Sequence, residues 1–215
     1  MSKQTKKKSL NKSSKPTPFS IKPLNAILIV GVFALVGGFL VYSSFAASNP
    51  PVCASGSRSQ GYRDAYKNGK KYKIRLCRIV GFKSTGDEDN GWVHVSSNAS
   101  GNWVALFKSA QRAGIKLTAN SSFRSYQKQK QLYDCYNRRA KGCNPAAPPG
   151  YSNHQSGEAI DIDIVPGPNN DPTLTECLRN YRKYPVYNWL SKNAYKYKRY
   201  GRVAKECWHW SPTGY

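Results

Sequence analysis

Negative charge is scarce in this sequence. Only 11 Asp and Glu accompany 34 Lys and Arg, which gives the 215-residue chain a formal charge of +23. Histidine is scarcer still, with three residues, and no C-x-x-C pair occurs. The missing C-x-x-C pairs argue against a cysteine-rich structural zinc site. No internal repeat is present, and the roughly 168 residues after position 47 are enough for one domain.

The first 25 residues contain no acid and no cysteine, but seven lysines. This composition predicts a disordered basic segment. Residues 26–47 are uncharged, and their central part would span about 30 Å as a helix, which is one bilayer core. The positive-inside rule then predicts a cell-membrane protein with a cytoplasmic N-terminus, an uncleaved signal anchor and an exterior domain. Small residues before Ala47 leave a cleaved signal peptide and a secreted product as the alternative.

Cysteine usage agrees with an exterior location. All six cysteines follow the apolar segment, and an even set in an oxidising compartment predicts three disulfides. Many pairings are possible, and proximity along the chain favours three of them: Cys53–Cys77, Cys135–Cys143 and Cys177–Cys207.

The part after the basic segment is strongly cationic, with 27 Lys and Arg against all 11 acids. Such a field attracts polyanions. Outside a cell these are anionic cell-wall polymers, lipid headgroups and the carboxylates of peptidoglycan stems. Stacking of single-stranded nucleic acid on the many tyrosines is the alternative, but no nucleic-acid motif accompanies the charge, so no nucleic-acid partner is expected.

Periodicity predicts an α+β fold, as a single domain over 61–215 with a small, mostly antiparallel sheet flanked by helices, after a linker at 48–60 and one N-terminal transmembrane helix. Apolar residues at helical spacing include Trp103, Leu106 and Phe107 in the first helix, and Tyr126, Leu132 and Tyr133 in the second. The expected helices are 100–114, 125–139 and 184–197, and the expected strands are a hairpin over 62–82, then 115–120, 157–165 and 208–210.

A turn at 86–91 contains three adjacent acids. Calcium ligands in such loops usually alternate along the chain, so a solvated turn is expected rather than a calcium site. His94 follows in an alternating, strand-like run, and we expect a structural role for it.

Two short stretches, Ser152–Asp161 and Glu206–His209, contain two of the three histidines. A catalytic zinc ion is usually held by three ligands drawn from His, Asp, Glu and Cys, with one position left open. His154 in a loop and Asp161 on the following strand can meet at one ion, and His209 arrives from a separate strand. A bend or bulge would bring the Glu206 carboxylate near a bound water. Either histidine could instead be satisfied by hydrogen bonds in the core.

The pattern S-x-H-x-x-G-x-A-x-D at 152–161, followed by E-x-W-H at 206–209, resembles the signature of the VanY-type D-alanyl-D-alanine carboxypeptidases, zinc peptidases that trim peptidoglycan stems. The block at 121–133, SSFRSYQKQKQLY, is similar to that family's S-G-Y-R-S-Y-x-x-Q-x-x-L-Y, and 189–194 is similar to its W-L-x-x-N-A. The resemblance covers roughly residues 100–210.

The resemblance implies that the cofactor Zn²⁺ is held by His154, Asp161 and His209. Glu206 would be general base and then general acid, and Arg124 would stabilise the oxyanion or hold the substrate carboxylate. Three further residues match positions near the substrate: Ser121, Gln129 and Ser152. The implied function is D,D-carboxypeptidase action on peptidoglycan stem peptides. A peptidoglycan endopeptidase of the same fold and a non-catalytic wall-binding module are the alternatives.

Two positions depart from the family pattern. Cys207 stands where proline is frequent: a disulfide there would rigidify the segment, whereas a free thiol could be a fourth ligand. Glu158 occupies a position that is usually small or apolar, and strand alternation predicts that it points away from Asp161. Asp163 has two open interpretations, as an orienting partner of a ligand histidine or as a loop cap.

Overall fold

The computed structural model describes residues 52–86, 88–164, 181–201, 203 and 206–214. The described residues belong to one compact unit, Ser48–Tyr215. The expected basic segment at 1–25 and membrane segment at 26–47 lie outside the described residues. Among the helices that are described, none is both long and apolar enough to cross a membrane.

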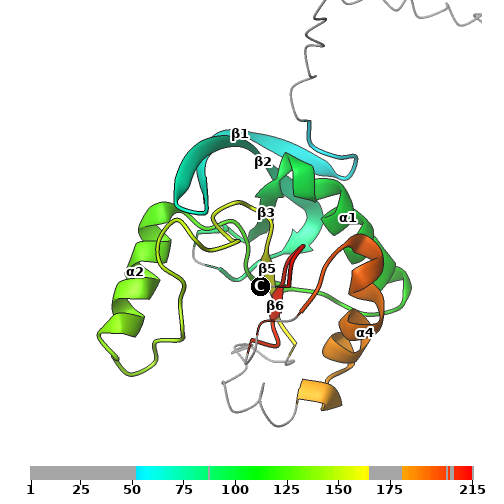
Figure 1. Cartoon of the computed structure of the whole chain (residues 1–215). Helices are drawn as coiled ribbons and strands as arrows, with labels where there is room; N and C mark the ends of the chain where they lie inside the picture. Colours follow the sequence, from blue (N-terminus) through cyan, green and yellow to red (C-terminus); the bar gives the residue numbers. More distant parts are fainter. Residues whose placement is uncertain (1–51, 87, 165–180, 202, 204–205, 215) are drawn as a thin grey trace, which may run out of the picture. The chain divides into compact units, whose positions relative to one another are not determined.

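The described residues of this unit form two three-stranded antiparallel sheets and three α-helices (Figure 1), which confirms the α+β class. The first sheet has the order β1 (Ser57–Lys67), β2 (Lys70–Lys83), β3 (Trp92–Ser96), and the second has the order β4 (Ala119–Ser121), β5 (Ile160–Ile162), β6 (His209–Trp210). The helices are α1 (Ser97–Arg112), α2 (Tyr126–Asn137) and α4 (Pro185–Asn193). In Figure 1, α2 and α4 lie on opposite sides of β5 and β6.

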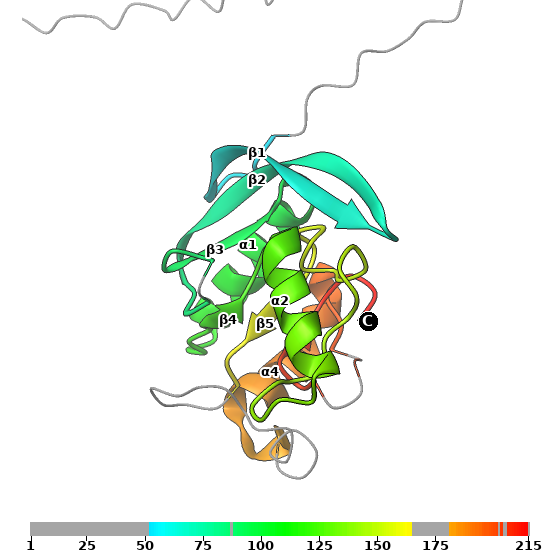
Figure 2. The ribbon, with the colours of Figure 1, turned by 90° about the vertical axis from the view of Figure 1, so that its left-hand side faces the viewer.

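The first two strands form the expected hairpin, which is long and curved (Figure 2). It begins at Ser57, inside the segment assigned to a linker. Asn68 and Gly69 connect the strands with φ of 52° and 75°, the positive values that a two-residue hairpin turn requires. The expected disulfide between Cys53 and Cys77, with Cα atoms 5.6 Å apart, ties the preceding segment to β2.

The core lies between the two sheets and α1. Trp103, Leu106 and Phe107 of α1 are fully buried, as their helical spacing predicted. They belong to one cluster with residues from both sheets and α4, including Val93, Ile160, Ile162 and Leu190. The short second sheet therefore has its position fixed by apolar burial, which contributes roughly 1.5–3 kcal/mol for each large side chain.

Several strands and helices are shorter than the sequence predicted. The strand expected at 115–120 is β4, which starts at Ala119. The strand expected to begin at 157 covers only Ile160–Ile162, and all three residues are buried because β5 lies between two other strands. The helix expected at 184–197 changes at Ala194 into a 3-10 turn, η2 (Ala194–Tyr197).

The buried side of α2 was predicted only in part: Leu132 and Tyr133 are half-buried, but Tyr126 is not. Tyr126 is 42% exposed and contacts the ring of Tyr66 in β1, with ring centroids 4.7 Å apart. The buried residue of α2 is Gln129, which is polar. A helix that lines a polar cleft does not follow the apolar pattern of a core helix.

The acidic turn is also different from the expectation of a solvated turn. Asp89 is 2% exposed and accepts hydrogen bonds from the hydroxyls of Ser84 and Ser122. Glu88 accepts from the backbone N–H and hydroxyl of Ser125, at the start of α2. These acids are buried or engaged because hydroxyl partners arrive from residues distant in the sequence. His94 lies in β3, as expected, and its N–H donates to Ser122 Oγ.

Replacing Gly157 with alanine should destabilise the unit strongly. Gly157 has φ +68°, and a Cβ there would lie 2.6 Å from the backbone N of Ser96. Gly114 is a matched control, since it has φ +72° and no atom within 4 Å of the added Cβ. In denaturant unfolding, Gly114→Ala should cost about 1–2 kcal/mol, and Gly157→Ala about 1–3 kcal/mol more. Equal losses would contradict the close approach of these two segments.

Candidate metal centre

The segment that carries His154, residues 150–158, contains no regular strand or helix. Backbone hydrogen bonds fix it from two sides. The hairpin contributes Gly69 N–H to Gly150 O (3.0 Å) and Tyr66 N–H to Gln155 O (3.1 Å). On the opposite side, Ser96 N–H donates to Gly157 O at 2.9 Å. His154 is therefore rigidly placed although it lies in a loop.

The protonation of His154 is set by a backbone carbonyl. Its Nδ1 lies 2.7 Å from the carbonyl oxygen of Ser122. Because a carbonyl oxygen can only accept, Nδ1 must be the donor, and Nε2 of the neutral ring presents a lone pair. His154 is 3% exposed, and burial, assisted by the charge of Arg124, lowers its pKa against the opposing effect of Asp161. The ring is therefore neutral at pH 7.

That lone pair faces two other acceptor atoms. His154 Nε2 lies 3.1 Å from Asp161 Oδ1 and 3.3 Å from His209 Nδ1, and the last two atoms are 3.0 Å apart. Burial raises the pKa of Asp161, but the net effect of its surroundings, the two neighbouring histidines included, is to lower it, so Asp161 is a carboxylate. At most one proton, on His209, is available among three acceptors. A cation at the centre would satisfy all three.

The three donors fit a zinc ion. A tetrahedral zinc with ligands at about 2.0–2.1 Å holds them about 3.3 Å from one another, close to the sides of this triangle. Two neutral imidazoles and a carboxylate are also the usual donors of catalytic zinc sites. Within the described ranges, this is the one group of three or more His, Cys, Asp or Glu whose donor atoms lie within 4.8 Å of one another.

Glu206 lies on the wall of the same cleft. A turn, in which His209 N–H donates to Glu206 O at 3.1 Å, separates it from β6 and supplies the expected bend. Burial, and then the charge of Asp161, raise the pKa of Glu206, while His209 and Arg124 oppose this. A carboxyl of raised pKa is suited to accept and return a proton near neutral pH.

The intervening Cys207 is disulfide-bonded, so a free thiol beside the metal is excluded. Its expected partner, Cys177, lies outside the described residues. The expected Cys135–Cys143 disulfide is present and closes the loop after α2, with Cα atoms 5.7 Å apart. Both cysteines of that bridge line the cleft.

Arg124 is held by a fixed set of acceptors. Nη1 donates to Gln129 Oε1 and Nη2 to Ser121 Oγ, both at 2.9 Å, and Nη2 lies 3.5 Å from Asp161 Oδ2. Gln129 in turn donates to the carbonyl of Ala147 at 2.7 Å. The guanidinium therefore stands beside the metal ligands in a preset orientation.

A single cleft of about 540 Å³ brings together every site residue predicted from the sequence. It is lined by Ser121, Arg124, Gln129, Ser152, His154, Asp161, Glu206 and His209.

Two other acids near the motif are not part of the donor group. Glu158 forms a salt bridge with Lys67 of the hairpin at 3.0 Å. Asp163 is 7% exposed, lies outside the ligand group, and its N–H donates to the Thr118 carbonyl at 2.8 Å.

Two groups that support the site were not predicted from the sequence. The Ser122 carbonyl is a backbone group and leaves no side-chain signal. Asp89, which accepts from the Ser122 hydroxyl, was read as part of an exposed turn. The sequence showed three acids clustered beside a strand, but it did not show which hydroxyl groups would donate to them.

The cleft of this α+β domain combines three donors that could bind a metal, a carboxyl group and a fixed guanidinium. This combination of groups is suited to peptide-bond hydrolysis. Residues 93–215, more than half of the chain, match a family model described as VanY: D-alanyl-D-alanine carboxypeptidase. The chain belongs to the VanY family of carboxypeptidases. The match begins at Val93, so the hairpin β1–β2 precedes it.

A curated relative, putative carboxypeptidase YodJ of Bacillus subtilis (strain 168), is 31% identical over 107 residues, which are 48% of this chain and 37% of that protein. The chain thus matches little more than a third of that relative's length. Similar solved structures include a vancomycin resistance D,D-pentapeptidase VanY in complex with Zn(II), with 26% identity, TM-score 0.41, and 57% and 74% of the two chains covered. Another is VanYB in complex with D-alanine-D-alanine, with 24% identity, TM-score 0.45, and 65% and 77% covered.

Zinc should stabilise the metal-free protein through these three ligands. At zinc concentrations about 100-fold above Kd, the gain is about 2.7 kcal/mol, measurable as a rise in the unfolding temperature. Asp161→Asn should remove most of this rise, since it takes away the only anionic ligand. His94→Gln is the control, because it changes the chain's one histidine outside the triad and should leave the zinc effect intact. An undiminished effect in Asp161→Asn would place the metal elsewhere.

Proposed function

We propose that this protein is a zinc-dependent D,D-carboxypeptidase that removes the terminal D-Ala from peptidoglycan stem peptides. The observation that carries the proposal is the position of Arg124. Its Nη2 lies 3.5 Å from Asp161 Oδ2, which supports a role for this guanidinium in binding a terminal carboxylate beside the metal. A substrate whose C-terminal carboxylate meets Arg124 would have its last peptide bond within one residue of the metal. That spacing selects an exopeptidase acting at the C-terminus.

His154, Asp161 and His209 would hold the zinc ion. When bound, zinc would polarise the scissile carbonyl and make a water molecule more acidic. The tautomer of His154, fixed by the Ser122 carbonyl, keeps its Nε2 available for this purpose.

Glu206 would accept a proton from the attacking water and return it to the nitrogen of the departing D-Ala. Its raised pKa matches both steps, because a base that is too weak cannot take the proton and one that is too strong cannot return it. Its place on the cleft wall, next in the chain to the His209 turn, keeps it close to the metal triad.

Arg124 would bind the terminal carboxylate, with Ser121 and Gln129 holding the guanidinium in position. Ser152 also lines the cleft, two residues before His154, and would contact the substrate backbone. These polar contacts favour a small terminal residue with a free carboxylate.

The proposed location is the exterior face of the cell membrane, with residues 26–47 as the anchor. Disulfides among the described cysteines support an oxidising compartment. The excess of cations supports attraction to anionic wall polymers in addition to the stem peptides. Recovery of the protein only in the medium, with a mature N-terminus near Ala47, would replace the anchor with a cleaved signal peptide.

Glu206→Gln should lower the rate of D-Ala release from a muramyl pentapeptide by about 10²–10⁴-fold, because it removes the proton acceptor. Zinc content should be unchanged, since Glu206 is not part of the donor triangle. Mass spectrometry of the products tests the bond that is cut. Release of D-Ala only from tetrapeptides, or cleavage inside the stem, would contradict D,D-carboxypeptidase action. Full activity of the variant would contradict the role of Glu206 as the base, and no D-Ala release by the zinc-loaded native protein would point to a wall-binding role.

Arg124→Lys should lower kcat/KM by about 10–100-fold, because an ammonium cannot reproduce the bidentate geometry of a guanidinium. The matched control is Arg138→Lys, at an exposed position just after α2. Steady-state kinetics on the pentapeptide and on its C-terminal amide separate the roles. If Arg124 binds the terminal carboxylate, the amide should be a poor substrate for the native protein and should lose little further in the variant.

A further inference from the structure

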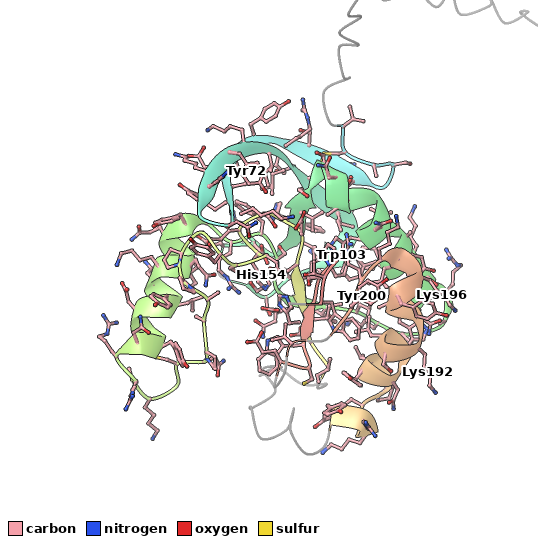
Figure 3. All side chains as sticks on the ribbon, viewed as in Figure 1. Tyr72, Trp103, His154, Lys192, Lys196 and Tyr200 are labelled. Atoms are coloured by element: carbon pink, nitrogen blue, oxygen red, sulfur yellow. A yellow bond between two sulfur atoms is a disulfide. The ribbon has the colours of Figure 1, made fainter. Side chains whose placement is uncertain are left out.

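The turn of the hairpin β1–β2 lies against the loop that leads to His154. Gly69 N–H donates to Gly150 O at 3.0 Å, and a Cβ on Gly150 would lie 3.2 Å from Gly69 Cα. Figure 3 shows Tyr72 of this hairpin above His154. The match to the family model begins only at residue 93, so the hairpin supports the metal-binding loop from outside the matched region.

Tyr151, the residue after Gly150, lines the catalytic cleft and is 60% exposed. Other large hydrophobic side chains of the described residues are also exposed, but none of them lines the cleft. Tyrosine is frequent at binding surfaces, because its ring offers a large contact area at a small cost in side-chain entropy. Its position at the open edge of the cleft therefore indicates a contact with substrate.

The end of the Tyr151 ring rests on the hairpin turn. A Cβ on Gly69 would lie 2.8 Å from Tyr151 Oη and 3.2 Å from Cζ, so glycine at this position leaves room for the ring. The backbone beneath the ring is also fixed, since Gly150 N–H donates to Gln155 Oε1 at 2.7 Å and Tyr151 N–H donates to Pro148 O at 3.1 Å. A ring that is held before binding loses little freedom when a ligand covers it.

The depth of the other groups in the cleft determines which part of a substrate reaches Tyr151. The side chain of Arg124 is only 15% exposed, and His154 is 3% exposed. A peptide whose terminal carboxylate reaches Arg124 has to leave the cleft through its N-terminal part. The exposed edge, where Tyr151 lies, therefore meets residues that precede the bond to be cut.

We propose that Tyr151, positioned by the hairpin turn, binds the part of the stem peptide that precedes the two terminal D-alanines. The face of the ring would pack against the aliphatic groups of that segment. The identity of the peptide rests on the proposed function. The consequence is a preference for long stem peptides over a bare D-Ala-D-Ala end.

A muramyl pentapeptide and N-acetyl-D-Ala-D-Ala are a matched pair of substrates, because only the first contains the preceding segment. In Tyr151→Ala, the ratio of their kcat/KM values should fall at least about tenfold in disfavour of the pentapeptide. The loss should lie in KM rather than kcat, as expected for a contact that is equal in the ground and transition states. Tyr151→Phe should keep most of the ratio, since the ring makes the contact. Tyr136→Ala is the control, because Tyr136 is 43% exposed and does not line the cleft.

Three results would overturn the proposal. The native protein could process both substrates equally well, so that the longer one gains nothing at the edge of the cleft. Tyr151→Ala could lower both kcat/KM values by the same factor, which would indicate damage to the metal-binding loop. Tyr151→Phe could lose as much as Tyr151→Ala, which would assign the effect to the hydroxyl instead of the ring.

Gly69→Ala tests the part played by the hairpin, since its Cβ would displace the end of the Tyr151 ring. Gly81→Ala is the control in the same hairpin: the two glycines have φ +75° and +85°, but a Cβ on Gly81 meets no atom within 4 Å. Both should lose about 1–2 kcal/mol of stability, whereas only Gly69→Ala should lower the substrate ratio. Gly69→Ala should have no further effect on the ratio in a Tyr151→Ala background. Equal ratios in the two glycine variants would contradict positioning by the hairpin.

Calorimetry separates this outcome from that of the proposed function. The zinc-loaded full chain with Glu206→Gln, in mild detergent, should bind the muramyl pentapeptide at least about tenfold more tightly than the same protein with Tyr151→Ala added. D-Ala release with equal binding by these two proteins would refute only the role of Tyr151. Tyr151-dependent binding without D-Ala release by the native protein would refute only the proposed peptidase activity.

Discussion

One hydrogen bond, from His154 Nδ1 to the carbonyl of Ser122, determines the chemistry of the site. It fixes the tautomer, so a lone pair on Nε2 faces the Asp161 carboxylate and His209. At most one proton is available among these three confined atoms, and a cation at their centre would satisfy all of them. The carbonyl of Ser122, the residue that follows β4, thus prepares the site to bind a cation, and metal binding and folding are expected to be coupled.

The distribution of acidic residues also favours a cation at this site. Only 11 are present in the chain, yet Glu88, Asp89, Asp161 and Glu206 all line the one cleft. The surface is left largely to lysine and arginine. A cationic protein would ordinarily repel a divalent ion, but the negative charge concentrated in this cleft attracts one locally. The same arrangement leaves the exterior free to attract polyanions.

The gathering of His154, Asp161, His209, Glu206 and Arg124 in one cleft could be predicted because their residue types and spacing form a pattern typical of a zinc site. The helices could be predicted from the period of Trp103, Leu106 and Phe107. The short strands could not be delimited, since the length of β5 depends on its pairing with β4 and β6 rather than on its own composition. Nor could the role of Asp89, because it depends on which distant groups fold against it.

Strand β6 is only two residues long, and its two side chains enter different pockets. A shift of its pairing by one residue would exchange an imidazole for an indole in both places, since neighbouring side chains in a strand point to opposite faces. The disulfide at Cys207 and the hydrogen bond from Ile162 N–H to Trp208 O therefore hold the register that places His209 in the cleft. Selection for the position of His209 in the cleft would therefore also preserve the position of Trp210 in the neighbouring pocket.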